Sequence, residues 1–163
     1  MVFLGSFDLL GLQLAACDHG FILGEIQKRI KKRRNFLTTP LASQTFVLAR
    51  SDKKLKKILD AYDYLFSDSL WVKRAINFLY QIGLRDRLRG SNFLLHVCEL
   101  AQKEKYRVFL YGTNNYTLAL LKRNLLHQYP KLKIVGMSPS FFRKLTRDEK
   151  KELIREIEKS RAD

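Results

Sequence analysis

The sequence is poor in cysteine and has no long hydrophobic run. Its two cysteines, Cys17 and Cys98, lie far apart in 163 residues, so a disulfide framework is not expected. Three scattered histidines, with no cysteine or carboxylate cluster beside them, do not predict a metal site. No apolar stretch approaches the roughly 20 residues of a membrane-spanning helix. The N-terminus lacks the basic segment of a cleaved signal peptide, and none is predicted.

Acidic residues are also scarce, with 16 Asp and Glu against 31 Lys and Arg. The net charge of +15 predicts an anionic partner: nucleic acid, an acidic membrane surface or a phosphorylated substrate. The densest basic run, Lys28–Arg34, ends an amphipathic helix and has no RNA-binding aromatic signature beside it. We interpret it as a solvated face or one turned to anionic lipid heads, without specific nucleic-acid binding.

Strand and helix patterns alternate along the chain. Arg107–Tyr111 is short, β-branched and aromatic, which predicts a strand, and a turn at Gly112 leads into an amphipathic helix. A second strand follows Pro130, so this segment has the pattern of a βαβ unit. We therefore predict one α/β domain over residues 1–163, Rossmann-like, with a largely parallel sheet and helices on both faces. Strands near Phe36, Tyr64, Val108 and Ile134 are expected side by side.

Polar residues follow several predicted strands. Asp68 comes just after the strand at 62–66 and is suited to a general base, a metal ligand or a sugar-binding group, or else to an N-cap of the next helix. Thr38 and Thr39 end another strand before Pro40; their hydroxyls can bind a phosphate or sugar, or simply form a turn.

A basic loop leads to the predicted helix 92–103, for which Ser91 is the expected cap. Arg85, Arg87 and Arg89 beside the N–H groups at Gly90 and Ser91 form a candidate diphosphate site, or else a solvated loop. Because ligands bind at the carboxyl edge of parallel sheets, Thr39, Asp68 and Arg87 are expected to converge there. Gly112 turns from strand to helix without a G-x-G-x-x-G fingerprint, and neither a G-x-S-x-G motif nor a P-loop is present.

In order, these segments resemble the bacterial WecG/TagA/CpsF glycosyltransferase family over about residues 7–163. The resemblance rests on the following pieces: Phe7–Gly11, Thr38-Thr39-Pro40, Leu48–Asp52, the strand Tyr62–Asp68, the turn Arg87–Ser91, and the unit Arg107–Gly112 with Tyr129–Gly136.

The resemblance implies transfer of a sugar from a UDP-sugar to a polyprenyl-diphosphate-linked acceptor, with inversion and without a metal or other cofactor. It implies Asp68 as the base, and Thr38, Thr39, Arg87, Gly90, Ser91 and Gly112 as substrate-binding residues. We accordingly expect a cytoplasmic protein, peripheral on the inner face of the plasma membrane, that forms a homo-oligomer.

The sequence also departs from the family pattern. Leu41 replaces the Asn of a Thr-Pro-Asn turn, Asp68 lies between serines instead of Pro and Gly, and the Gly-rich turn keeps only Gly112. The family's C-terminal strand, Gly-x-Pro-Lys-Gln-Glu segment and basic tail do not follow Asp163, so this chain alone is expected to be inactive. The alternative function is a non-catalytic basic α/β module that binds nucleic acid or an anionic membrane surface.

Overall fold

The computed structural model describes residues 1–85 and 87–163. Contacts divide the chain into two compact units, Met1–His96 and Val97–Asp163. Strands and helices alternate in both, and among the described residues every strand pairing except β1–β2 is parallel. The mixed α/β class with mostly parallel pairing is therefore confirmed. That residues 1–163 form one domain stays a prediction.

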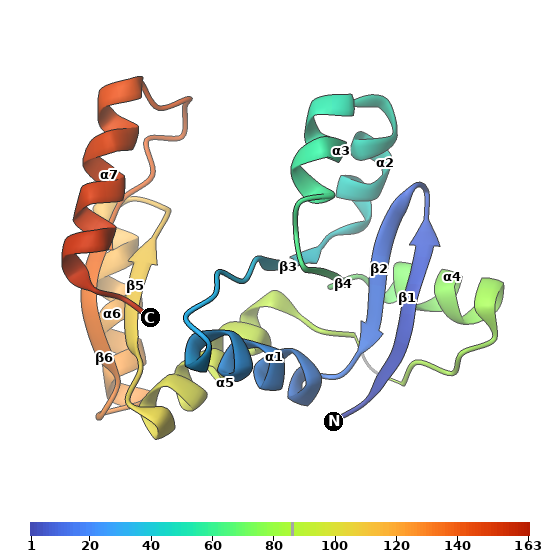
Figure 1. Ribbon diagram of the computed structural model, residues 1–163, viewed down its shortest axis with the longest axis horizontal. Coiled ribbons are helices and arrows are strands. Elements are labelled where there is room, and N and C mark those ends of the chain that lie inside the picture. Colours follow the sequence, from blue (N-terminus) through green and yellow to red (C-terminus); the bar gives the residue numbers. More distant parts are fainter. Residues whose placement is uncertain (86) are drawn as a thin grey trace. The chain divides into compact units, whose positions relative to one another are not determined.

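The elements of the first unit are followed in Figure 1. They are β1 (Phe3–Leu9), β2 (Leu12–Cys17), α1 (His19–Lys31), β3 (Thr38–Leu41), α2 (Ser43–Ser51), α3 (Lys53–Leu59), β4 (Tyr64–Ser67), α4 (Leu70–Tyr80) and the beginning of α5 (Gly90–Glu104). The second unit contains the rest of α5, β5 (Arg107–Tyr111), α6 (Asn115–Gln128), β6 (Lys133–Ser138) and α7 (Arg147–Ser160).

The first unit is built on a four-stranded sheet in the order β1-β2-β4-β3. The hairpin β1–β2 turns at Leu10 and Gly11, whose φ angles of 55° and 84° fit a tight turn. β3 runs parallel to β4 at one edge, with Thr39 opposite Leu65. Pro40 was expected to end this strand but lies within it, which an edge strand tolerates because one side needs no N–H donor.

Helices cover both faces of this sheet, as predicted. On one face, Leu12, Leu14 and Leu65 pack with α2, α3 and α4 through buried side chains that include Phe46 and Ile76. On the other, the core consists of Ala15, Cys17, Ile22, Phe66 and Leu88, with half-buried residues of α1 and α5 packed against it. Alternate residues of β2 and β4 therefore supply two different cores, the pattern of a strand buried on both sides.

The second unit carries its own sheet, in which β5 and β6 run parallel. The four strands expected side by side are thus divided between two sheets in the described residues, and the expectation of one continuous sheet is wrong. Two of the expected pairings are found, that of the strand near Phe36 with the strand at Tyr64 and that of β5 with β6. Whether these two pairs join is not encoded in local periodicity. The chain end is held in this unit, because Asp163 accepts hydrogen bonds from the backbone and guanidinium of Arg107.

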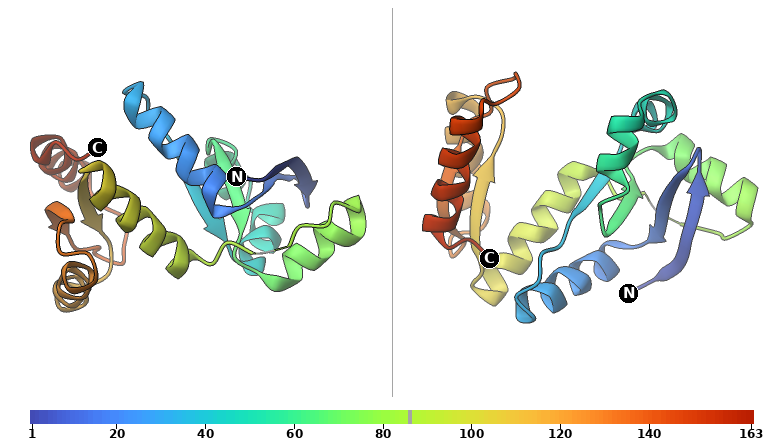
Figure 2. Two further views of the ribbon diagram at one scale, coloured as in Figure 1. Left: turned by 90° about the horizontal axis from the view of Figure 1, so that it is seen from below. Right: turned by 45° about the horizontal axis from the view of Figure 1, so that its top comes forward.

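Two local expectations are also corrected. The spacing of Trp71, Ala75 and Phe78 predicts that this stripe of α4 faces inward, but Trp71 is 70% and Phe78 79% exposed, whereas Val72 and Ile76 are buried. Figure 2 shows α4 beside β1, and the Tyr80 hydroxyl donates to the carbonyl of Asp8 at 2.6 Å. Helix α4 is apolar over most of its circumference, so its sequence pattern fits burial of Trp71 and Phe78 as well as burial of Val72 and Ile76. Ser91 was expected to cap a helix from residue 92, but α5 begins at Gly90.

Candidate functional site

The carboxyl ends of β3 and β4 meet the start of α5. The backbone N–H of Asp68 donates to Leu41 at 3.1 Å and continues the β3–β4 pairing beyond the strands. The N–H of Leu88 donates to the carbonyl of Ser67 at 3.1 Å, which holds the loop before α5 against the end of β4. A Cβ placed on Gly90 would lie 3.2 Å from Cγ of Pro40 and 3.9 Å from Oδ2 of Asp68. Three segments distant in sequence therefore converge at one sheet edge.

The carboxylate of Asp68 is not the cap of α4. The N-cap is Ser69, whose hydroxyl accepts from the N–H of Val72 at 3.4 Å and also receives a hydrogen bond from Ser43. Asp68 is half-buried, and its carboxylate forms no hydrogen bond or ion pair with any described residue. Ser69 thus takes the capping role that was the structural alternative for Asp68. The half-buried carboxylate of Asp68 therefore remains available at the sheet edge.

The two threonines of β3 are placed differently. Thr38 donates its hydroxyl proton to the carbonyl of Tyr64 at 2.8 Å and so ties β3 to β4. Thr39 makes a longer local contact of 3.3 Å to the carbonyl of Pro40. Thr39 directly precedes the residue that touches Gly90, and of the two threonines it lies nearer the junction with α5. The lone pairs of both hydroxyl oxygens can still accept hydrogen bonds from a ligand.

The loop before α5 contains three arginines, and whether the Arg87 side chain converges with Thr39 and Asp68 stays a prediction. Arg85 and Arg89 are exposed and Arg87 is half-buried. No described side chain caps the first N–H groups of α5, at Gly90, Ser91 and Asn92. The N-terminus of this 15-residue helix carries partial positive charge, and the preceding loop adds the charge of the arginines. This combination of donors and charge suits a phosphate group.

Helix α4 fixes the beginning of this loop. The side-chain amide of Asn77 donates to the carbonyl of Leu84 at 2.9 Å and accepts from its N–H at 2.7 Å. The ammonium group of Lys73 donates to the carbonyl of Arg85 at 2.6 Å. These contacts satisfy backbone polar groups of Leu84 and Arg85 and hold these two residues against α4.

Gly112 belongs to the other unit, where it follows β5. Its φ of +130° lies in a region that glycine adopts readily, and its N–H donates to Ser138 at 3.1 Å. The next helix, α6, begins beyond it with Asn114 as N-cap. The strand–turn–helix geometry predicted there is confirmed, while any substrate contact of Gly112 stays a prediction.

The sequence pattern did not identify Ser69 as the cap or Asn77 as the clamp of the loop. For Ser69 a signal existed, since Ser, Asp and Ser occupy three successive positions before the helix and all are good caps. Asn77 offered none, because its partner is a backbone group seven residues away across a turn. In the described part of the chain, no three His, Cys, Asp or Glu residues are grouped so as to hold a metal ion.

Comparison with known protein families identifies the chain. Among the described residues no helix has both the length and the apolarity needed to cross a bilayer. A model of the glycosyl transferase WecG/TagA/CpsF family matches residues 7–163, which covers the sheet edge, the loop and both units. The chain therefore belongs to the WecG/TagA/CpsF glycosyltransferase family, which acts in cell-surface polysaccharide synthesis.

Proposed function

We propose that this protein transfers a sugar from a UDP-sugar to a polyprenyl-diphosphate-linked acceptor at the inner face of the plasma membrane. The observation that carries the proposal is the available carboxylate of Asp68 beside the start of α5. A base must reach the acceptor hydroxyl, and a phosphate-binding group must lie close to it. Both requirements are supported at the edge where β3, β4 and α5 converge.

Asp68 acts as the general base in this proposal. The acceptor hydroxyl oxygen attacks the anomeric carbon while its proton passes to the Asp68 carboxylate. The bond between the anomeric carbon and the UDP oxygen breaks, and UDP leaves with that electron pair. One displacement of this kind inverts the anomeric centre. The hydroxyl of Thr39, on the neighbouring strand, is assigned to a hydrogen bond with a sugar hydroxyl or a phosphate oxygen.

The leaving diphosphate is assigned to Arg87 and the N-terminus of α5. A guanidinium group gives paired, charge-assisted hydrogen bonds to phosphate oxygens. The N–H groups at Gly90 and Ser91 add donors, and the absence of a side chain at Gly90 leaves space beside Pro40 and Asp68. Positive charge there stabilises the charge that develops on UDP as the bond breaks.

The test separates binding from turnover. UDP-sugar binding is measured by calorimetry, and UDP release is measured with a lipid-linked acceptor, for the 163-residue chain alone and with the C-terminal portion of a family member added. We expect Asp68→Asn to keep UDP-sugar binding and lower turnover by about 10²–10⁴-fold, the usual effect of losing a general base. Arg87→Gln should weaken UDP-sugar binding. Undiminished turnover in Asp68→Asn would contradict the assignment.

The same samples test the alternative of a non-catalytic basic module. Such a module would bind an oligonucleotide or anionic vesicles and show no affinity for UDP-sugars. Arg87→Gln and a substitution elsewhere on the basic surface would then have equal effects, because unspecific binding depends on total charge.

A further inference from the structure

Apart from the candidate site, the first unit has a cavity where β1 begins and β2 ends. These ends meet because the strands are antiparallel, with Phe3 opposite Cys17. Val2 and Leu4 line one side, and Ile82, Leu84 and Arg85 of the loop after α4 line another. Its volume of about 440 Å³ lies within the roughly 300–1,000 Å³ of small-molecule sites. Since β2 runs parallel to β4, this is the same carboxyl edge of the sheet that carries Asp68.

The wall of this cavity is mostly apolar. Val2, Leu4, Ile82 and Leu84 contribute aliphatic side chains. Burial raises the pKa of the Cys17 thiol to about 12, so the thiol is uncharged at neutral pH. A neutral buried thiol behaves as a small hydrophobic group. The cavity therefore suits a hydrocarbon chain better than a sugar or a base.

The charge at the rim is positive. Arg85 is exposed and forms no ion pair with a described residue. Asp18 also lines the cavity, but its carboxylate accepts from the N–H of Phe21 at 2.8 Å and pairs with the Met1 amino group at 3.5 Å. The negative charge is thus already compensated, whereas the guanidinium is available. An apolar cavity with a cation at its mouth fits an amphiphile with an anionic head.

The loop after α4 connects this cavity to the candidate site. Leu84 lines the cavity and is clamped by Asn77, while Leu88 in the same loop is bound to Ser67, next to Asp68. A ligand whose head lies on this loop can therefore place its apolar chain in the cavity and its reacting group toward Asp68.

We propose that the cavity holds the first isoprene units of the lipid-linked acceptor, with the acceptor diphosphate on Arg85. This inference rests on the proposed function, which supplies an acceptor that carries a polyprenyl diphosphate. It assigns Val2, Leu4, Ile82 and Leu84 to the hydrocarbon chain. Arg85 then binds the acceptor, while Arg87 serves the donor.

The probe is farnesyl diphosphate, which has three isoprene units and a diphosphate head, bound to the 163-residue chain and measured by calorimetry. Leu4→Trp fills the cavity and should weaken binding by about tenfold or more. The matched control is Leu10→Trp at the hairpin tip, because Leu10 and Leu4 are similarly exposed, at 45% and 41%. Arg85→Gln should weaken farnesyl diphosphate but not farnesol, and the exposed Arg50→Gln should change neither.

A second measurement needs no variant. Farnesyl diphosphate should shift the NMR methyl resonances of Val2, Leu4 and Leu84, while those of Leu118 and Leu125 in the other unit serve as the internal control. Inorganic diphosphate should give no such shift. Equal affinity of the Leu4→Trp and Leu10→Trp variants, or unchanged methyl resonances of Val2 and Leu4 with the probe, would overturn the assignment.

The outcomes also separate this inference from the proposed function. If farnesyl diphosphate shifts the Val2 and Leu4 resonances but UDP-sugars do not bind, the transferase proposal fails and the lipid cavity stands. If sugar is transferred to a lipid-linked acceptor and Leu4→Trp leaves its KM unchanged, the cavity assignment fails alone.

Discussion

Gly90 and Asp68 lie so close that a Cβ on the glycine would be 3.9 Å from a carboxylate oxygen of the aspartate. Such a Cβ would also lie 3.2 Å from the ring of Pro40, which is closer than most such contacts. Helix α5, whose N-terminus we propose binds the donor diphosphate, therefore begins directly against the proposed base. Gly90 thus serves to keep this junction open.

Filling the junction should impair catalysis more than folding. We expect Gly90→Val to lower turnover by about 10- to 100-fold, because a displacement near 1 Å at a reacting group has effects of that size. The measurements are UDP release and thermal unfolding. Asn92→Val, an exposed change in the same helical turn, is the control. Equal turnover in the two variants would show that the space beside Asp68 is not used.

The division of roles between Ser69 and Asp68 predicts opposite effects on stability. Ser69→Ala removes the N-cap of α4 and should lower the free energy of unfolding by about 0.5–2 kcal/mol. Asp68→Ala should leave it nearly unchanged, since its carboxylate has no partner among the described residues. Urea unfolding measures both. A larger loss in the Asp68 variant would mean that this carboxylate is structural.

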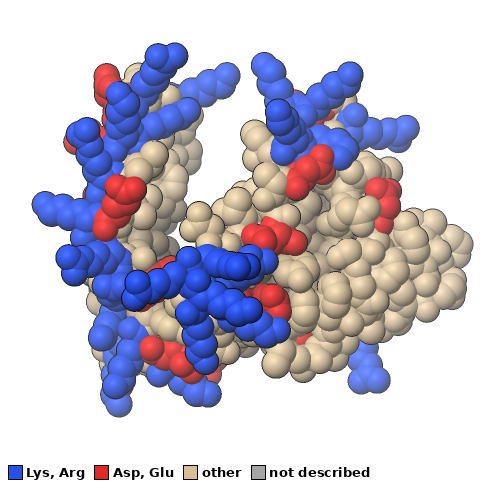
Figure 3. Space-filling model, in the orientation of Figure 1, with Lys and Arg blue, Asp and Glu red and all other residues tan. Residues whose placement is uncertain are grey.

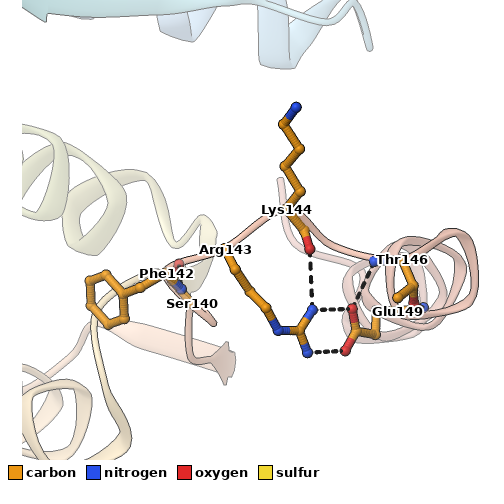
Figure 4. Close-up of polar contacts among 6 residues, drawn as sticks. All are labelled: Ser140, Phe142, Arg143, Lys144, Thr146 and Glu149. Carbon is orange, nitrogen blue, oxygen red and sulfur yellow. Dashed lines mark hydrogen bonds and ion pairs between the residues drawn. The ribbon is translucent and has the colours of Figure 1, made fainter.

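The first turn of α7 predicts an unusually acidic carboxyl group. Side-chain hydrogen bonds from Arg143, at 2.6 and 2.9 Å, lower the pKa of Glu149 to about 2, and the N–H of Thr146 adds to the effect (Figure 4). Because the folded pKa is depressed, the stabilisation is present above the ordinary value of 4.5 and is lost as pH falls toward 2.

NMR titration of the Glu149 carboxyl group measures this directly. The midpoint should lie near 2 in the parent chain and move back toward 4.5 in Arg143→Gln. Glu152, on the next turn of α7, serves as the internal reference within each titration. A Glu149 midpoint that does not move in Arg143→Gln would contradict the assigned cause.

The end of α1 predicts salt-dependent binding to anionic vesicles. Lys28 and Arg29 form ion pairs with Glu25 and Asp63, respectively. The four basic residues at positions 31–34 are exposed. Figure 3 shows Lys and Arg gathered over α1 and over α2–α3. Each cation near an anionic surface contributes about 1 kcal/mol. Replacing four by Gln should reduce vesicle co-sedimentation strongly: Lys31, Lys32, Arg33 and Arg34.

The control for this four-residue variant removes the same number of charges from exposed positions of the second unit: Lys105, Arg123, Lys131 and Lys144. If both sets reduce vesicle binding equally at several salt concentrations, the end of α1 is not a specific membrane contact. In that case only the total charge of the chain matters.

Close packing in the second unit predicts a severe effect of a single methyl group. A Cβ on Gly136 would lie 2.5 Å from Cε2 of Phe109, on the paired strand. We expect Gly136→Ala to lower the free energy of unfolding by about 1–3 kcal/mol, as overpacking does. Phe109→Leu should partly rescue it. Strict additivity of the two changes in urea unfolding would exclude this contact as the cause.

The features that sequence predicted well depend on near neighbours. The Thr-x-x-Glu spacing of Thr146 and Glu149 predicts a capping box, and the spacing of Leu118 and Leu125 predicts a helix; the structure has both. The failures depend on distant partners or on choices between equivalent residues. The helical spacing of Trp71, Ala75 and Phe78 predicts an inward stripe, yet Val72 and Ile76 of the same helix face the sheet.

The candidate site follows the same division. The rule for parallel strands predicts that Thr39, Asp68 and Arg87 converge at one edge. The structure brings the ends of β3 and β4 together there with Gly90 beside them, and the convergence of the Arg87 side chain stays a prediction. That Asp68 is not the helix cap could not be derived, because Ser69 is an equally good cap one position away. The apolar cavity was also hidden, because Val2 and Leu84 come together only through the hairpin and the clamped loop.

The clamp at Asn77 has a consequence for the outer side of α4. One amide holds both backbone groups of Leu84, and Lys73 holds the next carbonyl, so Leu84 and Arg85 are anchored to α4. The outer side of that helix exposes Trp71 and Phe78. A partner that packs against those rings would therefore contact the same helix that anchors two residues of the cavity wall.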